Sequence, residues 1–536
     1  MIFDLEKDPN LPDFAADVCV VGAGVAGLVL SAEMLRQGKR VLLLESGGAG
    51  METAVQNLNA CFYTGQPRRT AHAGGCRVLG GTSTAWGGQI LGLREGDFAA
   101  RAWLPGSGWP LDETELKPYY QRALAAEGLS AALQSDEEVW QQMKTDPPPL
   151  GDELECYFTR WCPEPNFARL YADVLNSSEL CVVLHATATA MLFREDGTRL
   201  RGLHCRTISG RQHDFSAARF VFCLGTIEAI RFLLQAGEEI GAKAWNRSGL
   251  LGKHFQSHID YNAASIPAQD ALRLRRWFAN VYIKGFKYHP KFRLSVAEQQ
   301  KRRILNIAGA ITCIHPAEKQ LRRAKRLAKD FLRNRKSQAG WRDLPSLARQ
   351  SGTMLMLAYG YRVQRRAWWS RDSSFWLRVH CEQEPTSQSR VTLSDVRDGV
   401  GLLQAKVDWR VSPLEWKTVR EFTEQARRNF AALGATGILP QPELDREDGF
   451  ANVTFDNSHH DMGGTRMSES PADGVVDPNL KLHGIDNAYV CSASVFPAGG
   501  FSNPTHTLIA LAIRLADHLV SRQPDAISLD GRNVHA

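Results

Sequence analysis

The feature that most constrains the fold is a glycine-rich turn close to the start of the chain. Residues 17–22 read D-V-C-V-V-G, and the turn G-A-G-V-A-G leads into the apolar-periodic stretch L-V-L-S-A-E-M-L-R-Q-G. A second candidate strand, residues 40–44 (R-V-L-L-L), is followed by Glu45. Because an apolar run, a glycine turn and helical periodicity follow one another, the sequence predicts a strand, a tight turn, a helix and a second strand.

Four positions of this unit are suited to holding a dinucleotide. Gly22 allows the tight turn, Gly24 lets the backbone approach a pyrophosphate at the helix N-terminus, and Gly27 permits close helix packing. Glu45 can accept hydrogen bonds from ribose hydroxyls. These residues do not separate FAD from NAD. The sequence has no second copy of the pattern, which argues against an enzyme that binds two dinucleotides.

A second glycine-rich stretch, residues 77–88, reads R-V-L-G-G-T-S-T-A-W-G-G. It has too many glycines for a helix or a strand. We expect a loop that comes close to something flat or anionic, with a plain surface turn as the alternative.

Composition limits the other possibilities. The chain has 536 residues, enough for two or more structural units, and 23% of them are charged, as in ordinary globular proteins. Residues 1–14 lack the basic and apolar regions of a secretory signal, so we expect a cytoplasmic protein. No apolar run approaches the ~20 residues of a membrane-spanning helix. The eleven cysteines show no metal spacing, and we expect neither zinc nor disulfides.

The positive charge is concentrated in residues 318–343. This segment holds ten Lys or Arg against three Asp or Glu, a net charge of +7, which leaves −1 for the rest of the +6 chain. Nucleic-acid binding is therefore not expected. Apolar residues recur at helical spacing, so the segment reads as a basic amphipathic helix. It either contacts an acidic partner, an anionic membrane surface or an electron acceptor, or simply packs on the protein with a solvated basic face.

Together with the run from His460 onward, H-D-M-G-G-T-R-M, these glycine motifs resemble the glucose-methanol-choline (GMC) family of FAD-dependent oxidoreductases. The stretch E-Q-E-P-T-S-Q-S-R-V-T from Glu382 is similar to the bacterial, sugar-oxidising, pyranose oxidase-like branch. The resemblance implies FAD as cofactor. Besides the N-terminal unit, it implies FAD contacts at Gly80, Gly81, Thr82, Ser83, Trp86, Gly225, Ala493, Asn503, Pro504 and Thr505.

The resemblance also implies an α/β fold in which a Rossmann-like FAD-binding domain interleaves with an α+β substrate domain built on an antiparallel sheet. We expect residues 1–255 to form the first part of the FAD-binding domain, with substrate-side insertions around residues 95–165. Residues 256–450 would form the substrate-binding domain, with the basic helical insertion at 318–343. Residues 451–536 would complete the FAD-binding domain and carry the catalytic residues.

The resemblance places the catalytic pair at His460 and Asn503. Oxidising an alcohol by hydride transfer requires removal of the hydroxyl proton, and a neutral imidazole is suited to accept it near pH 7. An asparagine amide can donate a hydrogen bond to the same oxygen. Pro504 is suited to the first position of the final helix, which we expect to run to about Val520. The positive end of that helix would favour the anion of reduced FAD.

Three further positions carry weaker expectations. His459 and His506 are possible substrate contacts, although each can equally be a packed or solvated neighbour. In the pyranose oxidase-like branch, a histidine just before the loop tryptophan carries a covalent bond to the flavin. Ala85 stands there in this sequence, so we expect non-covalent FAD.

The sequence thus predicts an FAD-dependent oxidoreductase that oxidises an alcohol group, with a secondary hydroxyl of a sugar, glycoside or polyol favoured. Neither the substrate nor the electron acceptor follows from the motifs. Two alternatives stay open: a non-redox lyase of the GMC type, and a non-catalytic flavoprotein recruited to a partner through its basic helix.

Overall fold

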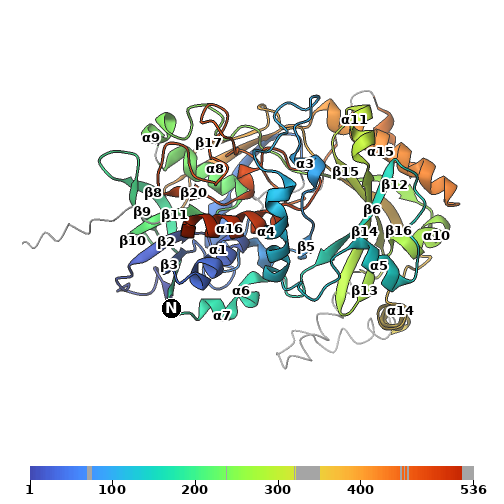
Figure 1. The fold of residues 1–536 in the computed structure, drawn as a ribbon, viewed down its shortest axis with the longest axis horizontal. Helices are drawn as coiled ribbons and strands as arrows, with labels where there is room; N and C mark the ends of the chain where they lie inside the picture. Colours follow the sequence, from blue (N-terminus) through green and yellow to red (C-terminus); the bar gives the residue numbers. More distant parts are fainter. Residues whose placement is uncertain are drawn as a thin grey trace, which may run out of the picture.

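The chain forms two parts, each built on a large sheet, that lie side by side along the long axis of the molecule (Figure 1). The computed structural model describes residues 1–68, 75–236, 238–318, 320, 351–446, 449–451, 453–455 and 458–521. The basic segment 318–343 therefore lies almost entirely outside the described residues.

The first part is a six-stranded parallel sheet. Its strands, in spatial order, are β1 (Ile2–Asp4), β7 (Leu180–Leu184), β3 (Val41–Leu44), β2 (Ala16–Val21), β11 (Ala217–Phe222) and β20 (Ala488–Val490). Every residue of β3 and β7 is buried, as expected for a parallel sheet covered on both faces. The predicted strand, turn, helix and strand are confirmed as β2, α1 (Val25–Arg36) and β3.

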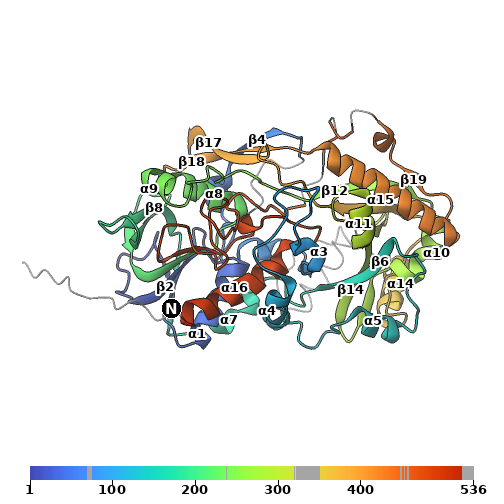
Figure 2. The same ribbon diagram turned by 45° about the horizontal axis from the view of Figure 1, so that its top comes forward.

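Helices α1, α16 (Pro504–Ser521) and α4 (Glu113–Ala126) pack together beside this sheet (Figure 1, Figure 2). Helix α8 (Thr226–Gln235) follows β11 directly. The final helix begins at Pro504, as the sequence predicts. The N-terminus of α1 and that of α16 both open toward the cavities described below, because Gly24 and Asn503 line them.

The second part is an eight-stranded antiparallel sheet. Its order is β19 (Leu439–Pro440), β12 (Ile259–Ile266), β16 (Ser374–Cys381), β15 (Ile307–Ile314), β14 (Phe286–Leu294), β6 (Leu154–Trp161) and β5 (Gln89–Ile90), with β13 (Val281–Ile283) paired to β14. Helix α15 (Pro413–Ala432) packs on one face, where Phe292 contacts Phe422 and Phe430. Strand geometry turns alternate residues of β14 to the opposite face.

Two three-stranded sheets complete the described strands: β10 (Gln212–Phe215), β9 (Leu200–Arg206) and β8 (Thr187–Phe193); and β17 (Arg390–Arg397), β18 (Leu403–Trp409) and β4 (Cys61–Gly65). The remaining short helices are α2 (Thr53–Gln56), α3 (Glu95–Phe98), α5 (Asp136–Met143), α6 (Phe167–Leu170), α7 (Ala172–Leu175), α9 (Glu238–Lys243), α10 (Ala268–Phe278), α11 (Val296–Arg302) and α14 (Ser351–Arg362). Single turns of 3₁₀ helix occur at η1 (Asn57–Asn59), η2 (Gly81–Thr84), η4 (Pro442–Asp445) and η5 (Ala493–Val495).

The expected fold class is confirmed, because a parallel and an antiparallel sheet coexist with interleaved chain segments. Strands β5 and β6 come from the first 255 residues but belong to the antiparallel sheet. The exact domain limits stay a prediction. None of the described helices has the length and apolarity needed to cross a lipid bilayer. All eleven cysteines are free of disulfide bonds.

Candidate active site

A cavity of about 620 Å³ lies where the two parts of the molecule meet. Its walls come from the second glycine loop, from residues 458–461, from the start of α16 and from strands β14, β15 and β16. Among the predicted site residues, it is lined by Thr82, Ser83, Trp86, Gly225, His459, His460, Ala493, Asn503, Pro504 and Thr505. Segments far apart in the sequence thus contribute to one cavity.

His460 and Asn503 meet at this cavity. The amide Nδ2 of Asn503 lies 3.2 Å from Nε2 of His460, and both side chains line the wall. Asn503 immediately precedes α16, so the helix start fixes its position. An amide nitrogen can only donate, so Nε2 of His460 is the acceptor and is unprotonated. A hydroxyl placed between them can give its proton to Nε2 and accept a hydrogen bond from Asn503.

A local pairing of two chain segments fixes the other side of the imidazole. Gln256 and Met462 form an antiparallel bridge with reciprocal backbone hydrogen bonds of 2.8 Å. This register places His258 opposite His460, and their Nδ1 atoms are 2.9 Å apart. Gly463 allows the close approach, since a Cβ there would lie 2.1 Å from the carbonyl oxygen of His254.

The surroundings keep His460 neutral. Burial lowers its pKa well below the usual value, and nearby His258, His380 and Lys291 lower it further. Burial also lowers the pKa of His258 to about 4. Asp461, the neighbour of His460, does not act on the imidazole through a hydrogen bond: its Oδ1 accepts from Arg68 Nη2 at 3.0 Å. His460 is therefore an available proton acceptor at neutral pH.

The two weaker expectations have different outcomes. His459 is exposed, has a left-handed backbone with φ of 56°, and lines the cavity beside His460. His506 is not among the lining residues. Its Nδ1 is 2.9 Å from a carboxylate oxygen of buried Glu127, and its ring stacks on Tyr120. The expectation of a substrate contact at His506 is corrected, because the helix turns this side chain into the packing between α16 and α4.

A second cavity, of about 240 Å³, adjoins the first and follows the N-terminal glycine turn. Gly22, Gly24, Glu45, Gly81, Thr82, Gly225 and Thr505 line it, and the last three of these also line the first cavity. A side chain at Gly24 would meet open space, so its backbone faces the cavity. Gly27 does not line either cavity. A Cβ there would lie 1.9 Å from the carbonyl oxygen of Gly22, which explains the requirement for glycine.

The two glycine motifs pack directly on each other. The N–H of Gly80 donates to the carbonyl of Ala23 at 2.9 Å, and a Cβ on Gly81 would lie 2.8 Å from the Cα of Gly24. Gly80 and Gly81 have φ of 97° and 55°, values that favour glycine. The second loop is thus held against the first, and Thr82 extends from it along both cavities.

Glu45 is placed at the expected edge of the sheet. Its carboxylate oxygens accept from the N–H groups of Ala23 and Gly47, each at 2.8 Å. Burial raises the pKa of Glu45 above its usual value. Each carboxylate oxygen has a further lone pair, so the residue can still accept from a ribose hydroxyl. The open backbone at Gly24, the carboxylate and the adjoining cavities fit an extended dinucleotide.

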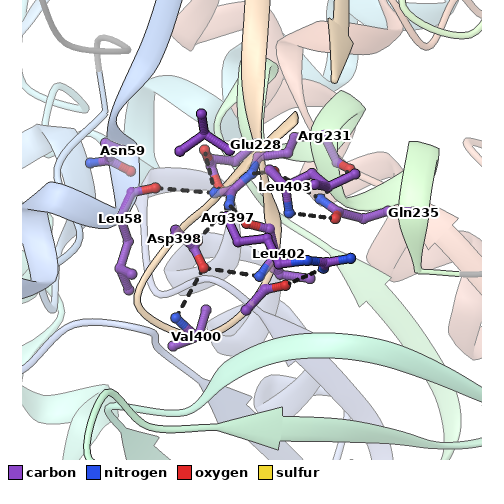
Figure 3. Close-up of polar contacts among 12 residues, drawn as sticks. Leu58, Asn59, Glu228, Arg231, Gln235, Arg397, Asp398, Val400, Leu402 and Leu403 are labelled. Atoms are coloured by element: carbon purple, nitrogen blue, oxygen red, sulfur yellow. Dashed lines mark hydrogen bonds and ion pairs between the residues drawn. The ribbon is translucent and has the colours of Figure 1, made fainter. Parts of the chain in front are cut away.

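A buried ion-pair network lies at the wall of the second cavity, which Glu228 and Arg231 help to line (Figure 3). Arg231 on α8 is 1% exposed and donates to Asp398 at 2.5 Å, to Glu228, and to the carbonyls of Leu58 and Leu403. Glu228 also pairs with Arg77 of the second glycine loop. The network therefore joins α8, the β17–β18 hairpin and the glycine loop around the cavity.

The sequence analysis did not identify the charged residues and histidines of the antiparallel sheet that line the first cavity. These are Asp260, His289, Lys291, Arg378 and His380. It also missed His258 as the partner of His460. His258, the last residue of L-G-K-H-F-Q-S-H, and the alternation in K-Y-H-P-K are visible in the sequence, but only the tertiary structure brings them to one cavity.

Comparison with known proteins finds sequence similarity to one family over part of the chain. Residues 385–512 match the family described as GMC oxidoreductase. Paromamine 6'-oxidase from Streptomyces fradiae is 32% identical over 158 residues, which are 28% of this chain and 28% of that protein. The fructose dehydrogenase large subunit from Gluconobacter japonicus is 28% identical over 138 residues, covering 26% and 23%. The matches thus span about a quarter of these relatives' length.

Solved structures share the fold over almost the whole chain. Pyridoxine 4-oxidase from Mesorbium loti superimposes with a TM-score of 0.56 at 17% identity, covering 95% of this chain and all of that one. Formate oxidase gives 0.56 at 16% identity, covering 95% and 99%. Residues 385–512 are thus similar to the GMC oxidoreductase family, in agreement with the resemblance that the motifs predict. The pyranose oxidase-like branch stays a prediction. The family is FAD-dependent.

Proposed function

We propose that the chain is an FAD-dependent oxidoreductase that oxidises an alcohol group to a carbonyl. The observation that carries the proposal is the 3.2 Å approach of Asn503 Nδ2 to His460 Nε2 at the wall of the larger cavity. His460 accepts the hydroxyl proton at Nε2, and Asn503 donates a hydrogen bond to the oxygen. His258 holds the other side of the imidazole through Nδ1.

Bound FAD would accept the hydride from the alcohol carbon. The residues that would hold it are those along both cavities: Gly22, Gly24, Glu45, Gly81, Thr82, Gly225, Pro504 and Thr505. Non-covalent attachment is part of the proposal, because Ala85 lines the cavity and its methyl group has no atom that could carry a flavin bond. Acid precipitation tests this: yellow colour in the pellet would contradict it.

A sugar or polyol hydroxyl is the proposed target. The matched relatives include a paromamine oxidase, a fructose dehydrogenase and a 2-methyl-1,2-propanediol dehydrogenase. The proposed compartment is the cytoplasm, which is supported by eleven cysteines without a disulfide.

An anaerobic screen of sugars, glycosides, polyols and aryl alcohols tests the activity. Bleaching of the flavin by at least one alcohol is expected, and admission of air then shows whether oxygen is an acceptor. A protein that retains FAD but is bleached by no alcohol, while it cleaves a hydroxynitrile, would be a lyase instead. Recruitment through the basic helix gains no support, because that segment lies outside the described residues.

A further inference from the structure

The antiparallel sheet presents a charged surface to the larger cavity, opposite the start of α16. Lys291 and His289 are two residues apart on β14, and Arg378 and His380 are two residues apart on β16. All four line the cavity, as does Asp260 on β12. Residues two apart on a strand share a face, and Phe292 packs on α15 at the other face. The side chains of Lys291 and His289 therefore point to the cavity.

Every carboxylate among the residues lining this cavity already has a cationic partner. Asp260 accepts from Arg378 through both oxygens, at 2.6 and 2.5 Å. Asp461 pairs with Arg68, and Glu228 pairs with Arg77. The protein thus leaves no unpaired carboxylate on the described part of this wall.

Lys291 is the cation that these pairs do not include. The residue is 5% exposed, and among the described residues its Nζ has no hydrogen bond or ion pair; the charge of Asp260 acts on it, but both oxygens of Asp260 already accept from Arg378. Burial lowers the pKa of Lys291 to about 8, so the ammonium form still predominates at pH 7. A buried ammonium without an acceptor is costly, which favours a ligand that brings one.

We propose that Lys291 binds an anionic group, a carboxylate or a phosphate, carried by the alcohol that His460 and Asn503 oxidise. This rests on the proposed function and names its substrate class: an acidic sugar or hydroxy acid, or a phosphate ester of a polyol. His289, on the same strand, lies beside Lys291 at the same wall, and its neutral imidazole can donate a further hydrogen bond to the oxyanion.

Anion binding is tested without turnover. The holoenzyme is titrated with acetate and with inorganic phosphate, and binding is followed by the flavin absorption spectrum and by calorimetry. Lys291→Met is expected to weaken binding at least ~10-fold, and Lys291→Arg to retain it. The control is Lys301→Met, which removes the same charge from an exposed lysine 72% accessible on α11. Equal affinity in the wild type and both methionine variants would overturn the proposal.

Substrate preference separates the two sources of the anion. Glucose, glucuronate, glucose 6-phosphate and glucosamine form a set of neutral, carboxylate, phosphate and cationic compounds. One of the two anions is expected to reduce the flavin with at least ~10-fold higher kcat/KM than glucose, and Lys291→Met to bring that ratio toward one. A preference for glucose or glucosamine would overturn the proposal. If anion binding depends on Lys291 but no alcohol reduces the flavin, the proposed oxidation of an alcohol is wrong and the anion site is still supported.

Discussion

His258 and His460 face each other through their Nδ1 atoms at 2.9 Å, held there by the antiparallel bridge between Gln256 and Met462. Between two neutral imidazoles, one nitrogen must donate and the other accept. Since Asn503 donates to Nε2, the proton of His460 resides on Nδ1 and points at His258. The pair therefore fixes one tautomer and turns the basic nitrogen toward the cavity.

Replacing His460 with alanine should remove the proton acceptor. The rate of flavin reduction by an alcohol is expected to fall by ~10²-fold or more, with FAD retained. Anaerobic stopped-flow absorbance measures it. His459→Ala is the matched control, since that side chain is exposed and the short approach of Asn503 is to His460; its rate is expected to stay within a few-fold of the wild type. An unchanged rate in His460→Ala would remove the residue from the base role.

The pH profile should report the lowered pKa of His460. Its neutral form predominates above about pH 6.5. The titration of His460 should therefore leave the rate of flavin reduction constant above this pH and lower it only in more acid solution. His258→Leu removes a group that lowers this pKa, so the acid limb should move to higher pH, with the rate reduced about tenfold or more. His258→Gln should partly restore the rate. Stopped-flow reduction over a pH series measures both, and an unshifted acid limb would contradict the pairing.

Lys291→Met should stabilise the protein at neutral pH. The folded pKa of about 8 lies below the ordinary 10.5, so the folded state binds fewer protons between these values and wild-type stability rises with pH there. Below pH 8 the wild type carries the full cost of the buried ammonium, on the order of 3 kcal/mol. Denaturant unfolding at pH 7 and pH 10 should show the stabilisation shrinking with pH. An equal difference in unfolding free energy between Lys291→Met and the wild type at both pH values would contradict the lowered pKa of Lys291.

Arg231→Met should destabilise the protein strongly, because it leaves the Asp398 carboxylate, whose side chain is 2% exposed, without its cation. Breaking a buried ion pair from one side typically costs about 3–5 kcal/mol in the free energy of unfolding. Arg397→Met is the control: its exposed guanidinium donates to the carbonyl of Gly401, and its loss should cost within about 0.5 kcal/mol. Denaturant unfolding measures both. If both substitutions change the free energy of unfolding by similarly small amounts, the network in Figure 3 does not stabilise the fold.

Gly81→Ala should weaken FAD binding. The new Cβ would lie 2.8 Å from the Cα of Gly24, at a backbone φ of 55° that disfavours alanine, so the two glycine loops must separate. FAD binding is expected to be at least ~10-fold weaker, since a loss of about 1.4 kcal/mol in binding free energy lowers the affinity tenfold. Flavin fluorescence after dialysis measures it. Gly399→Ala serves as control, because its Cβ would meet only Leu58 at 3.6 Å.

Local patterns predicted the parts of the molecule in which neighbours in sequence act together. The strand, turn and helix around Gly22, the helix start at Pro504 and the family of the C-terminal region are of this kind. His506 shows the limit: its sequence position one turn into α16 suggested the substrate, but helical rotation and the carboxylate of Glu127 place it in the packing. No spacing rule predicts which way such a side chain turns.

The sequence by itself determined the dinucleotide turn and the order of the motifs, because glycine backbone freedom and hydrophobic periodicity act over a few residues. Only the tertiary structure determined which residues meet. It pairs His258 with His460, and it brings Lys291, Arg378 and Asp260 to the wall of the same cavity. These contacts depend on strand registers between segments more than one hundred residues apart. Such registers arise from packing of the whole sheet, and no local pattern encodes them.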